Sequence, residues 1–263
     1  MPRDARKKLE RLRAYFRKLD GAVVAYSGGV DSSVLAKTAH DILGKKAIAV
    51  TVKSQTMDAS ELAAAKKTAK EIGIRHAVLE YRVKEKRFWE NAKDRCYYCK
   101  KEIAGVLKKF AAENGTMPVV EGTNAEDLLG HRPGYRALKE AGILNPYVEL
   151  GITKKDIRCI ASLLCLPNAE KPSAACLVSR IPYGTKITEE LLKKVSRAEK
   201  IVRSAGVSQI RVRCFCDVAV IEVCPKDYDK VLAAKKRISQ GLRKLGFSRV
   251  ALDLEGYATG RMD

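Results

Sequence analysis

Residues 21–43 read GAVVAYSGGVDSSVLAKTAHDIL, and this stretch decides the fold. Its first six residues form an apolar run that is typical of a short buried strand, and SGGVDSS interrupts that run. Apolar residues then recur with the period of a helix. Glycines in such a turn let the backbone approach an anion, and the start of the next helix offers N–H groups and a favourable dipole. We therefore predict a phosphate-binding loop made of Ser27, Gly28, Gly29, Val30, Asp31 and Ser32.

The pattern of this loop differs from the two common phosphate-binding motifs. It contains neither the GxxxxGK(S/T) of a Walker A loop nor the GxGxxG of a dinucleotide fold. The hydroxyls of Ser27 and Ser32 can donate to phosphate, and Asp31 can hold a Mg²⁺ ion that bridges phosphates. The alternative is a glycine-rich turn in which Asp31 only caps the helix, but the complete hexapeptide between a strand and a helix favours phosphate binding.

Short apolar segments alternate with helical ones on both sides of the loop. The apolar segments are continuous, as in strands that are buried on both faces. This order predicts an α/β fold in which helices cover both faces of a parallel sheet. The expected strands are residues 21–26, 47–52, 74–80 and 118–122, and the expected helices besides the one after the loop are residues 5–19, 58–72, 98–113 and 153–165.

The pattern changes after residue 165. Residues 166–187 contain three prolines and no period, which predicts a long, functional loop that carries Cys176. The remaining segments predict a small α+β domain at 188–263, and residues 1–165 then form the nucleotide-binding domain. The expected elements of the small domain are a helix at 188–205, strands at 209–214 and 217–223, a helix at 227–245 and a strand at 249–254.

The composition limits the class of protein. The chain has 263 residues, with 51 Lys and Arg against 31 Asp and Glu, and a formal net charge of +20. This charge favours nucleotides, pyrophosphate or RNA as partners, although a lysine-rich solvated surface would give the same number. No apolar run approaches the ~20 residues of a membrane span, and the basic N-terminal segment lacks the apolar core of a secretory signal. We therefore expect a cytoplasmic protein with no membrane partner.

Eight cysteines in a cytoplasmic chain indicate metal or redox chemistry rather than disulfides. Cys96 and Cys99 form a CxxC pair, and Cys176 stands alone in the long loop. The others are expected in the core, with a less favoured metal site among the last three. They are Cys159, Cys165, Cys214, Cys216 and Cys224.

The loop SGGVDS resembles the signature of the PP-loop ATP pyrophosphatases, whose members cleave ATP between the α and β phosphates and transfer AMP to an oxygen of the substrate. The resemblance implies a PP-loop (adenine nucleotide α-hydrolase-like) fold and an enzyme that uses ATP and Mg²⁺. In this family the phosphate loop, which here includes a catalytic Asp31, binds the pyrophosphate. It also implies that Ser54, Gly122 and Thr123 meet the nucleotide. The acyl-adenylate would face Asp127, His131, Arg132 and Arg136.

Four further segments resemble the LarE-type ATP-dependent sulfur transferases, and the likeness runs from about residue 5 to the C-terminus. Such proteins adenylate a pyridinium carboxylate on a mononucleotide and replace an oxygen by sulfur. The thiocarboxylate then enters the nickel-pincer nucleotide cofactor. The segments are GTNAEDLLGHRPGYRAL (122–138), KPSAACLVSRIPYG (171–184), IRVR (210–213) and LDLEGYATGRMD (252–263).

Cys176 matches the sulfur-bearing cysteine of that family, which in sacrificial members gives up its own sulfur. The added Cys96 and Cys99 depart from the sacrificial pattern and resemble a three-cysteine variant. There the three thiolates hold a [4Fe-4S] cluster whose fourth iron stays open for sulfur. We expect the cluster to supply the sulfur. Sacrifice of Cys176 is the first alternative, and a zinc or redox CxxC is the second.

The C-terminal domain contains a second set of candidate ligands. Guanidinium groups fork onto phosphate oxygens, so this set is expected to bind the phosphate of the substrate. Glu199 and Glu222 are candidates for a cation site, and the alternative for these charges is a network of ion pairs. The domain is also expected to form a homo-oligomer. The phosphate ligands are Ser179, Arg180, Arg211 and Arg213.

Four functions remain open at this point. The first is sulfur transfer to a small carboxylated nucleotide, with a sulfide donor as a possible partner. A tRNA thiolase of the same superfamily would explain the charge, but the chain has no zinc-ribbon cysteine pairs. An amidating synthetase would not need cysteines, and a nucleotide sensor would bind ATP without releasing pyrophosphate.

Overall fold

The computed structural model describes residues 2–115, 117–129, 132–172 and 175–258. The chain divides into two compact units. The first consists of Met1–Glu85 and Asp94–Ala174, and the second of Lys86–Lys93 and Ala175–Asp263. The break therefore falls inside the expected loop 166–187, which is shared between the units rather than forming a separate linker.

The first unit is built on a parallel sheet whose strand order is β3-β2-β1-β4. The carboxyl ends of parallel strands meet at one edge, so the loops that follow them gather there. The predicted parallel sheet is confirmed, although the last strand is shorter than expected. The strands are β1 (Ala22–Ala25), β2 (Ala47–Lys53), β3 (Arg75–Glu80) and β4 (Val119–Val120).

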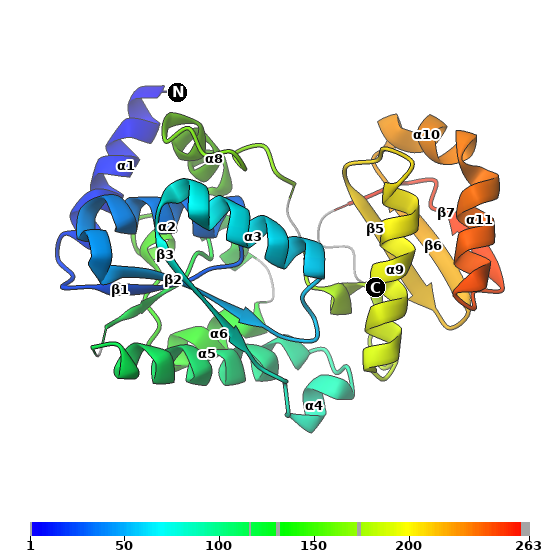
Figure 1. Ribbon diagram of the computed structural model, residues 1–263, viewed down its shortest axis with the longest axis horizontal. Coiled ribbons are helices and arrows are strands. Elements are labelled where there is room, and N and C mark those ends of the chain that lie inside the picture. The colour runs from blue at the N-terminus through cyan, green and yellow to red at the C-terminus, as the bar shows by residue number, and fades with distance from the viewer. Residues whose placement is uncertain (1, 116, 130–131, 173–174, 259–263) are drawn as a thin grey trace. The chain divides into compact units, whose positions relative to one another are not determined.

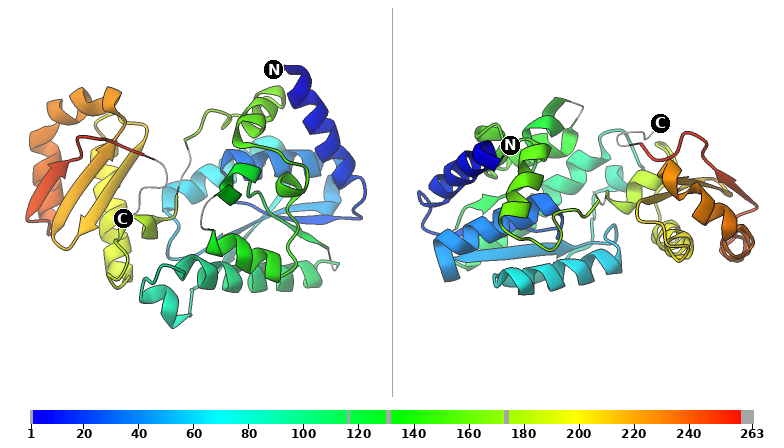
Figure 2. Two further views of the ribbon diagram at one scale, coloured as in Figure 1. Left: turned by 180° about the vertical axis from the view of Figure 1, so that it is seen from behind. Right: turned by 90° about the horizontal axis from the view of Figure 1, so that it is seen from above.

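Helices cover both faces of this sheet, as predicted (Figures 1 and 2). Successive side chains of β1 point to opposite faces, so Val24 packs with α1, α2, α3 and α8, whereas Val23 packs with α5 and α6. The two cores leave β1 buried on both sides. The helices are α1 (Pro2–Phe16), α2 (Val30–Leu43), α3 (Ala59–Ile72), α5 (Arg95–Glu113), α6 (Pro133–Glu140), α7 (Pro146–Glu149) and α8 (Lys154–Leu163), with short 3₁₀ turns η1 (Gly44–Lys46) and η2 (Ala125–Leu129).

The second unit contains a three-stranded sheet in the order β5-β6-β7. β5 and β6 are antiparallel, and β6 and β7 are parallel. The predicted order helix, strand, strand, helix, strand is confirmed, but the second helix is broken at Ala234. The elements are α9 (Glu189–Arg203), β5 (Ile210–Phe215), β6 (Val218–Val223), α10 (Tyr228–Ala233), α11 (Lys235–Lys244) and β7 (Arg249–Leu252), with 3₁₀ turns η3 (Leu177–Arg180) and η4 (Pro225–Asp227).

A short segment from the middle of the chain joins this unit. α4 (Lys86–Trp89) precedes Asn91, whose buried amide donates to the carbonyls of Pro182 and Thr185, each at 2.7 Å. The backbone also pairs, because the N–H of Ile187 donates to the carbonyl of Trp89 at 2.8 Å.

Two cysteines that were expected in the core are exposed, and both predictions were wrong. Cys165 follows the end of α8 with φ of +52°, and a helix must end before a residue such as Pro167. Cys216 follows β5 with φ of +55° and turns the chain toward β6. Neither residue therefore continues the element whose pattern suggested burial.

No helix among the described residues has the length and apolar character needed to cross a membrane.

The start of α8 is fixed by a reciprocal capping box. The hydroxyl of Thr153 accepts from the N–H of Asp156, and the Asp156 carboxylate accepts from the N–H of Thr153 at 2.9 Å. Lys8 of α1 donates to the same carboxylate at 2.8 Å. These contacts set the position of Lys154, the first residue of the helix.

We expect Asp156→Asn to lower the free energy of unfolding at pH 7 by about 1 kcal/mol. Burial raises the pKa of Asp156, but the hydrogen bonds from Lys8 and Thr153 outweigh burial, so the pKa lies below its ordinary value. A lowered pKa stabilises the fold above the unfolded value of about 3.9, and the benefit is lost as the pH falls through the folded value. Urea unfolding at pH 7 and pH 3 measures both effects. Asp94→Asn is the control, because Asp94 precedes α5 without a side-chain cap bond. Equal losses at pH 7 and pH 3 would contradict the linkage.

Candidate functional site

The predicted phosphate loop lies between β1 and α2 at the carboxyl edge of the sheet (Figure 1). Gly28 has φ of +74°, and a Cβ atom there would lie 2.6 Å from the Cα of Ala65. The Ser27 hydroxyl lies 3.2 Å from that of Ser32, which donates to the carbonyl of Gly29 at 3.1 Å. The loop is thus shaped by its own serines, and only glycine fits at Gly28.

Asp31 lies in the first turn of α2 and is held from two directions. Its Oδ2 atom is 2.5 Å from the Nζ of Lys154, and its carbonyl accepts from the hydroxyl of Tyr147 at 2.8 Å. Among the described residues its Oδ1 atom, which is buried, has no hydrogen-bond partner. A buried carboxylate oxygen without a donor is the kind of ligand that Mg²⁺ takes, so the loop fits the expected ion.

Asn168 supports the phosphate loop from the opposite side. This buried residue donates to the carbonyl of Gly28 at 3.1 Å and to the hydroxyl of Ser33 at 2.9 Å. Arg158 in turn donates to the carbonyl of Ala169 at 2.8 Å. These hydrogen bonds hold the segment after α8 against the phosphate loop.

The ends of β2 and β4 also reach this edge. Ser54 is buried, with its hydroxyl 2.9 Å from that of Thr56. Gly122 passes close to Asp31, because a Cβ at Gly122 would lie 3.4 Å from the Asp31 carbonyl carbon. The N–H and hydroxyl of Thr123 both donate to Glu121 at 2.9 Å. Burial raises the pKa of Glu121, against the opposing effects of Lys100 and these hydrogen bonds.

The residues expected at the acyl-adenylate are partly brought together. Asp127 accepts from Asn124 at 2.7 Å and from the guanidinium of Arg132. Arg136 lies over the ring of Tyr97 at 4.6 Å and pairs with Glu140 at 3.6 Å. The structure thus gives Arg136 partners on α5 and α6, and its contact with the adenylate stays a prediction. His131 lies outside the described residues.

Cys96 and Cys99 lie one turn apart at the start of α5, where Cys96 is exposed and Cys99 is buried. α6 approaches this turn closely, since a Cβ at Gly134 would lie 3.7 Å from the Cβ of Cys96. All eight cysteines are described, and none forms a disulfide. Within the described parts of the chain, no three His, Cys, Asp or Glu side chains are grouped to hold a metal ion.

In the second unit, Cys176 is exposed at the start of η3, and Arg180 fixes its backbone. One Arg180 nitrogen donates to the carbonyls of Ala175 and Cys176, at 2.7 Å and 2.9 Å. The rest of the guanidinium forms a buried two-point pair with Glu199, at 2.7 Å and 3.0 Å. Arg180 thereby ties the cysteine loop to α9.

The other expected phosphate ligands adjoin this pair. Arg213 forms a second two-point pair with Glu222 and donates to the carbonyl of Ser179 at 3.0 Å. Arg211 lies over the ring of Tyr257 at 5.0 Å, and burial and the nearby Arg180 lower the pKa of Arg211. Since Glu199 and Glu222 bind arginines, the network of ion pairs is observed in place of a cation site.

One family model matches part of the chain, and three known proteins match most of its length. The asparagine synthase family model matches residues 21–105. The chain is 41% identical to an uncharacterized protein of Synechocystis sp. across 97% of both chains. It is 35% identical to the pyridinium-3,5-bisthiocarboxylic acid mononucleotide synthase of Lactiplantibacillus plantarum, over 95% of this chain and 91% of that one. The chain belongs to the LarE family of PP-loop enzymes. An uncharacterized protein of Methanocaldococcus jannaschii is 33% identical over 89% of this chain and 90% of its own.

Membership of the LarE family confirms the predicted PP-loop fold and makes this chain an ATP-using sulfur-transferase enzyme. Sequence reasoning nevertheless missed three residues that shape the LarE phosphate loop, namely Lys154, Asn168 and Tyr147. One signal was available for Lys154. The dipole of a helix disfavours a cation in its first turn, so Lys154 at the start of α8 favours a nearby anion, although α11 begins with Lys235 and has no such partner among the described residues.

We expect Gly28→Ala to weaken ATP binding and to destabilise the fold. The new methyl group would overlap Ala65, and the alanine backbone would have to adopt a positive φ. Gly142→Ala is the matched control, since Gly142 has φ of +73° and nothing within 4 Å of the added atom. Thermal unfolding and equilibrium binding of ATP measure the two effects. Equal losses in both variants would show that only the backbone angle matters.

We expect Lys154→Met to reduce the rate of pyrophosphate release by about a hundredfold, because the phosphate loop loses a fixed positive charge. Lys155→Met is the control, since Lys155 is an exposed lysine in the same turn. Single-turnover release of pyrophosphate is the measurement. Similar rates for the two variants would remove Lys154 from the site.

Proposed function

We propose that the chain adenylates a carboxylate of a small mononucleotide and then replaces an oxygen of that carboxylate by sulfur. A carboxylate oxygen attacks the α phosphorus of ATP, and pyrophosphate leaves. A sulfur nucleophile then attacks the carbonyl carbon, AMP leaves, and a thiocarboxylate remains. The observation that carries this proposal is the phosphate loop with the buried, unpartnered Oδ1 of Asp31. The relative named as a bisthiocarboxylic acid mononucleotide synthase supports the substrate class.

Each unit supplies one part of this chemistry. The phosphate loop holds the pyrophosphate, and Ser54, Gly122 and Thr123 lie at the strand ends that the nucleotide meets. The adenylate is bound by Asp127, Arg132 and Arg136. The phosphate of the substrate is bound by Ser179, Arg180, Arg211 and Arg213. The product enters nickel-pincer nucleotide synthesis. The working form is a homo-oligomer, which light scattering tests.

The sulfur source is a [4Fe-4S] cluster held by Cys96, Cys99 and Cys176. Thiolates are the ligands that such clusters take, and two of the three lie one helical turn apart at the start of α5. This assignment rests on the sequence pattern, since no metal group is formed by the described residues. When bound, the cluster would provide sulfide for transfer, and Cys176 would survive each turnover.

An anaerobic purification separates the two sulfur sources. We expect about four irons and as many acid-labile sulfides per chain, as a cubane cluster requires. Cys176→Ala should lose or destabilise this iron. Cys165→Ala is the matched control, because Cys165 is also exposed outside a regular element, and it should keep the iron.

A protein without iron after reconstitution, in which Cys176 loses the mass of H₂S after one turnover, would overturn the cluster and establish a sacrificial cysteine. Adenylation is tested separately by ATP-dependent release of pyrophosphate in the presence of the carboxylated nucleotide. No release would overturn the proposed function itself.

A further inference from the structure

The helices of the second unit expose positive charge that the proposed reaction does not use. From Lys230 to Leu252 the chain has seven Lys and Arg residues and no Asp or Glu. Together with α9, this segment forms a surface that we call the basic layer. Its exposed cations are Lys193, Arg197, Lys200, Arg203, Lys230, Lys235, Lys236, Arg237, Arg243, Lys244 and Arg249.

The packing of α9 and α11 gathers these charges into one surface. Gly241 lets α11 approach closely, since a Cβ there would lie 3.1 Å from a methyl group of Ile201 on α9. Ile238 and Leu242 are buried, which turns the cations of α11 outward. On α9, Lys193, Arg197 and Lys200 repeat every three or four residues, so they line one face over about 10 Å.

In the helices of the first unit, by contrast, cations form ion pairs within the same helix. α1, α2, α3, α5 and α6 each contain a lysine or arginine paired with an acid three or four residues away, as in Lys37 with Asp41 and Lys109 with Glu113. Within the described residues, no salt bridge involves an exposed cation of α9 or α11, whereas Lys230 of α10 pairs with Asp227 at 2.6 Å. Exposed charges of one sign without ion-pair partners attract an extended anion more strongly than paired charges do.

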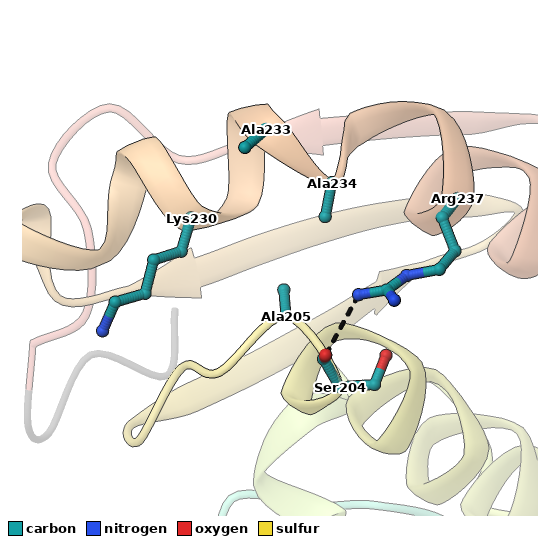
Figure 3. Close-up of a pocket in the computed structure, with 6 residues that line it drawn as sticks. All are labelled: Ser204, Ala205, Lys230, Ala233, Ala234 and Arg237. Atoms are coloured by element: carbon teal, nitrogen blue, oxygen red, sulfur yellow. Dashed lines mark hydrogen bonds between the residues drawn. The ribbon is translucent and has the colours of Figure 1, made fainter.

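An open hollow of about 560 Å³ continues the basic layer between the end of α9 and α10 (Figure 3). Lys230 and Arg237 line it, with Ala205, Ala233 and Ala234 between them. Arg237 donates to the carbonyl of Ser204 at 3.0 Å, which holds the guanidinium at the rim. Small side chains leave room there for a phosphate and its sugar.

We propose that the basic layer binds the phosphodiester backbone of a nucleic-acid duplex. A duplex carries one negative charge per roughly 1.7 Å of its axis, which complements rows of exposed cations. The described helices of the layer expose no aromatic ring on which single-stranded bases would stack, and Phe247 is buried beneath Lys194. Burial of Ile238 and Leu242 leaves α11 without an apolar face to enter a membrane.

Fluorescence anisotropy of labelled RNA and DNA hairpins with the whole protein tests this proposal. We expect binding at 50 mM salt that weakens at least tenfold at 200 mM, because phosphate contacts release counterions. The variant K200E/K236E/R243E should bind at least tenfold more weakly at 50 mM salt. The stronger of the two hairpins identifies the natural form of the duplex.

The control K7E/R11E/K70E makes the same charge change on exposed residues of α1 and α3, and it should bind as the unchanged protein does. Circular dichroism melting confirms that both variants are folded. Equal weakening in both variants, no binding of either hairpin, or tighter binding to single strands or to phosphatidylserine vesicles would each overturn the proposal. The test does not depend on sulfur transfer, since none of these residues belongs to the phosphate loop or to the arginine network.

Discussion

Asp31 is the residue at which distant parts of the first unit are joined. Lys154 of α8 pairs with its carboxylate, Tyr147 donates to its main-chain carbonyl, and Gly122 lies close to its backbone. The capping box at Thr153 fixes the helix that carries Lys154, so the position of one charged atom depends on the start of α8. An anion at the loop therefore meets helix N–H groups and a fixed lysine together, which requires little reorganisation on binding.

In the second unit, ion pairs hold the loop that carries the exposed thiol of Cys176. The backbone on either side of Cys176 is held by Arg180, whose guanidinium is itself held by Glu199. Arg213 and Glu222 repeat this arrangement at Ser179. Removing either glutamate would leave a buried guanidinium uncompensated, so the two ion pairs are strongly constrained even where they add little net stability. Their effect is to fix the path of the loop that carries the thiol.

Local pattern was sufficient for the phosphate loop and for the parallel sheet that carries it, but it did not predict the order of the strands. The glycines, the apolar run of β1 and the period of α2 all lie within 23 residues, and the loop follows from them. The parallel sheet follows from the alternation of apolar and helical segments over residues 21–122. Lys154, Tyr147 and Asn168 lie more than 110 residues from the loop that they contact, and no local pattern encodes such contacts. The same reason explains why residues 86–93 were not assigned to the second unit. The side-chain amide of Asn91 donates hydrogen bonds to residues about 90 positions away in the sequence.

The distribution of charge separates two kinds of anion recognition in this chain. The cations beside the phosphate loop and Cys176 are at least partly buried, and Lys154, Arg180 and Arg213 each have a carboxylate partner. Such groups are held in place and act over short distances on a small ligand. Exposed lysines are screened beyond about 8 Å at physiological salt, so one of them contributes little to a small anion. Rows of such lysines act together only on a partner whose own charges are repeated along its length, and the basic layer has that form.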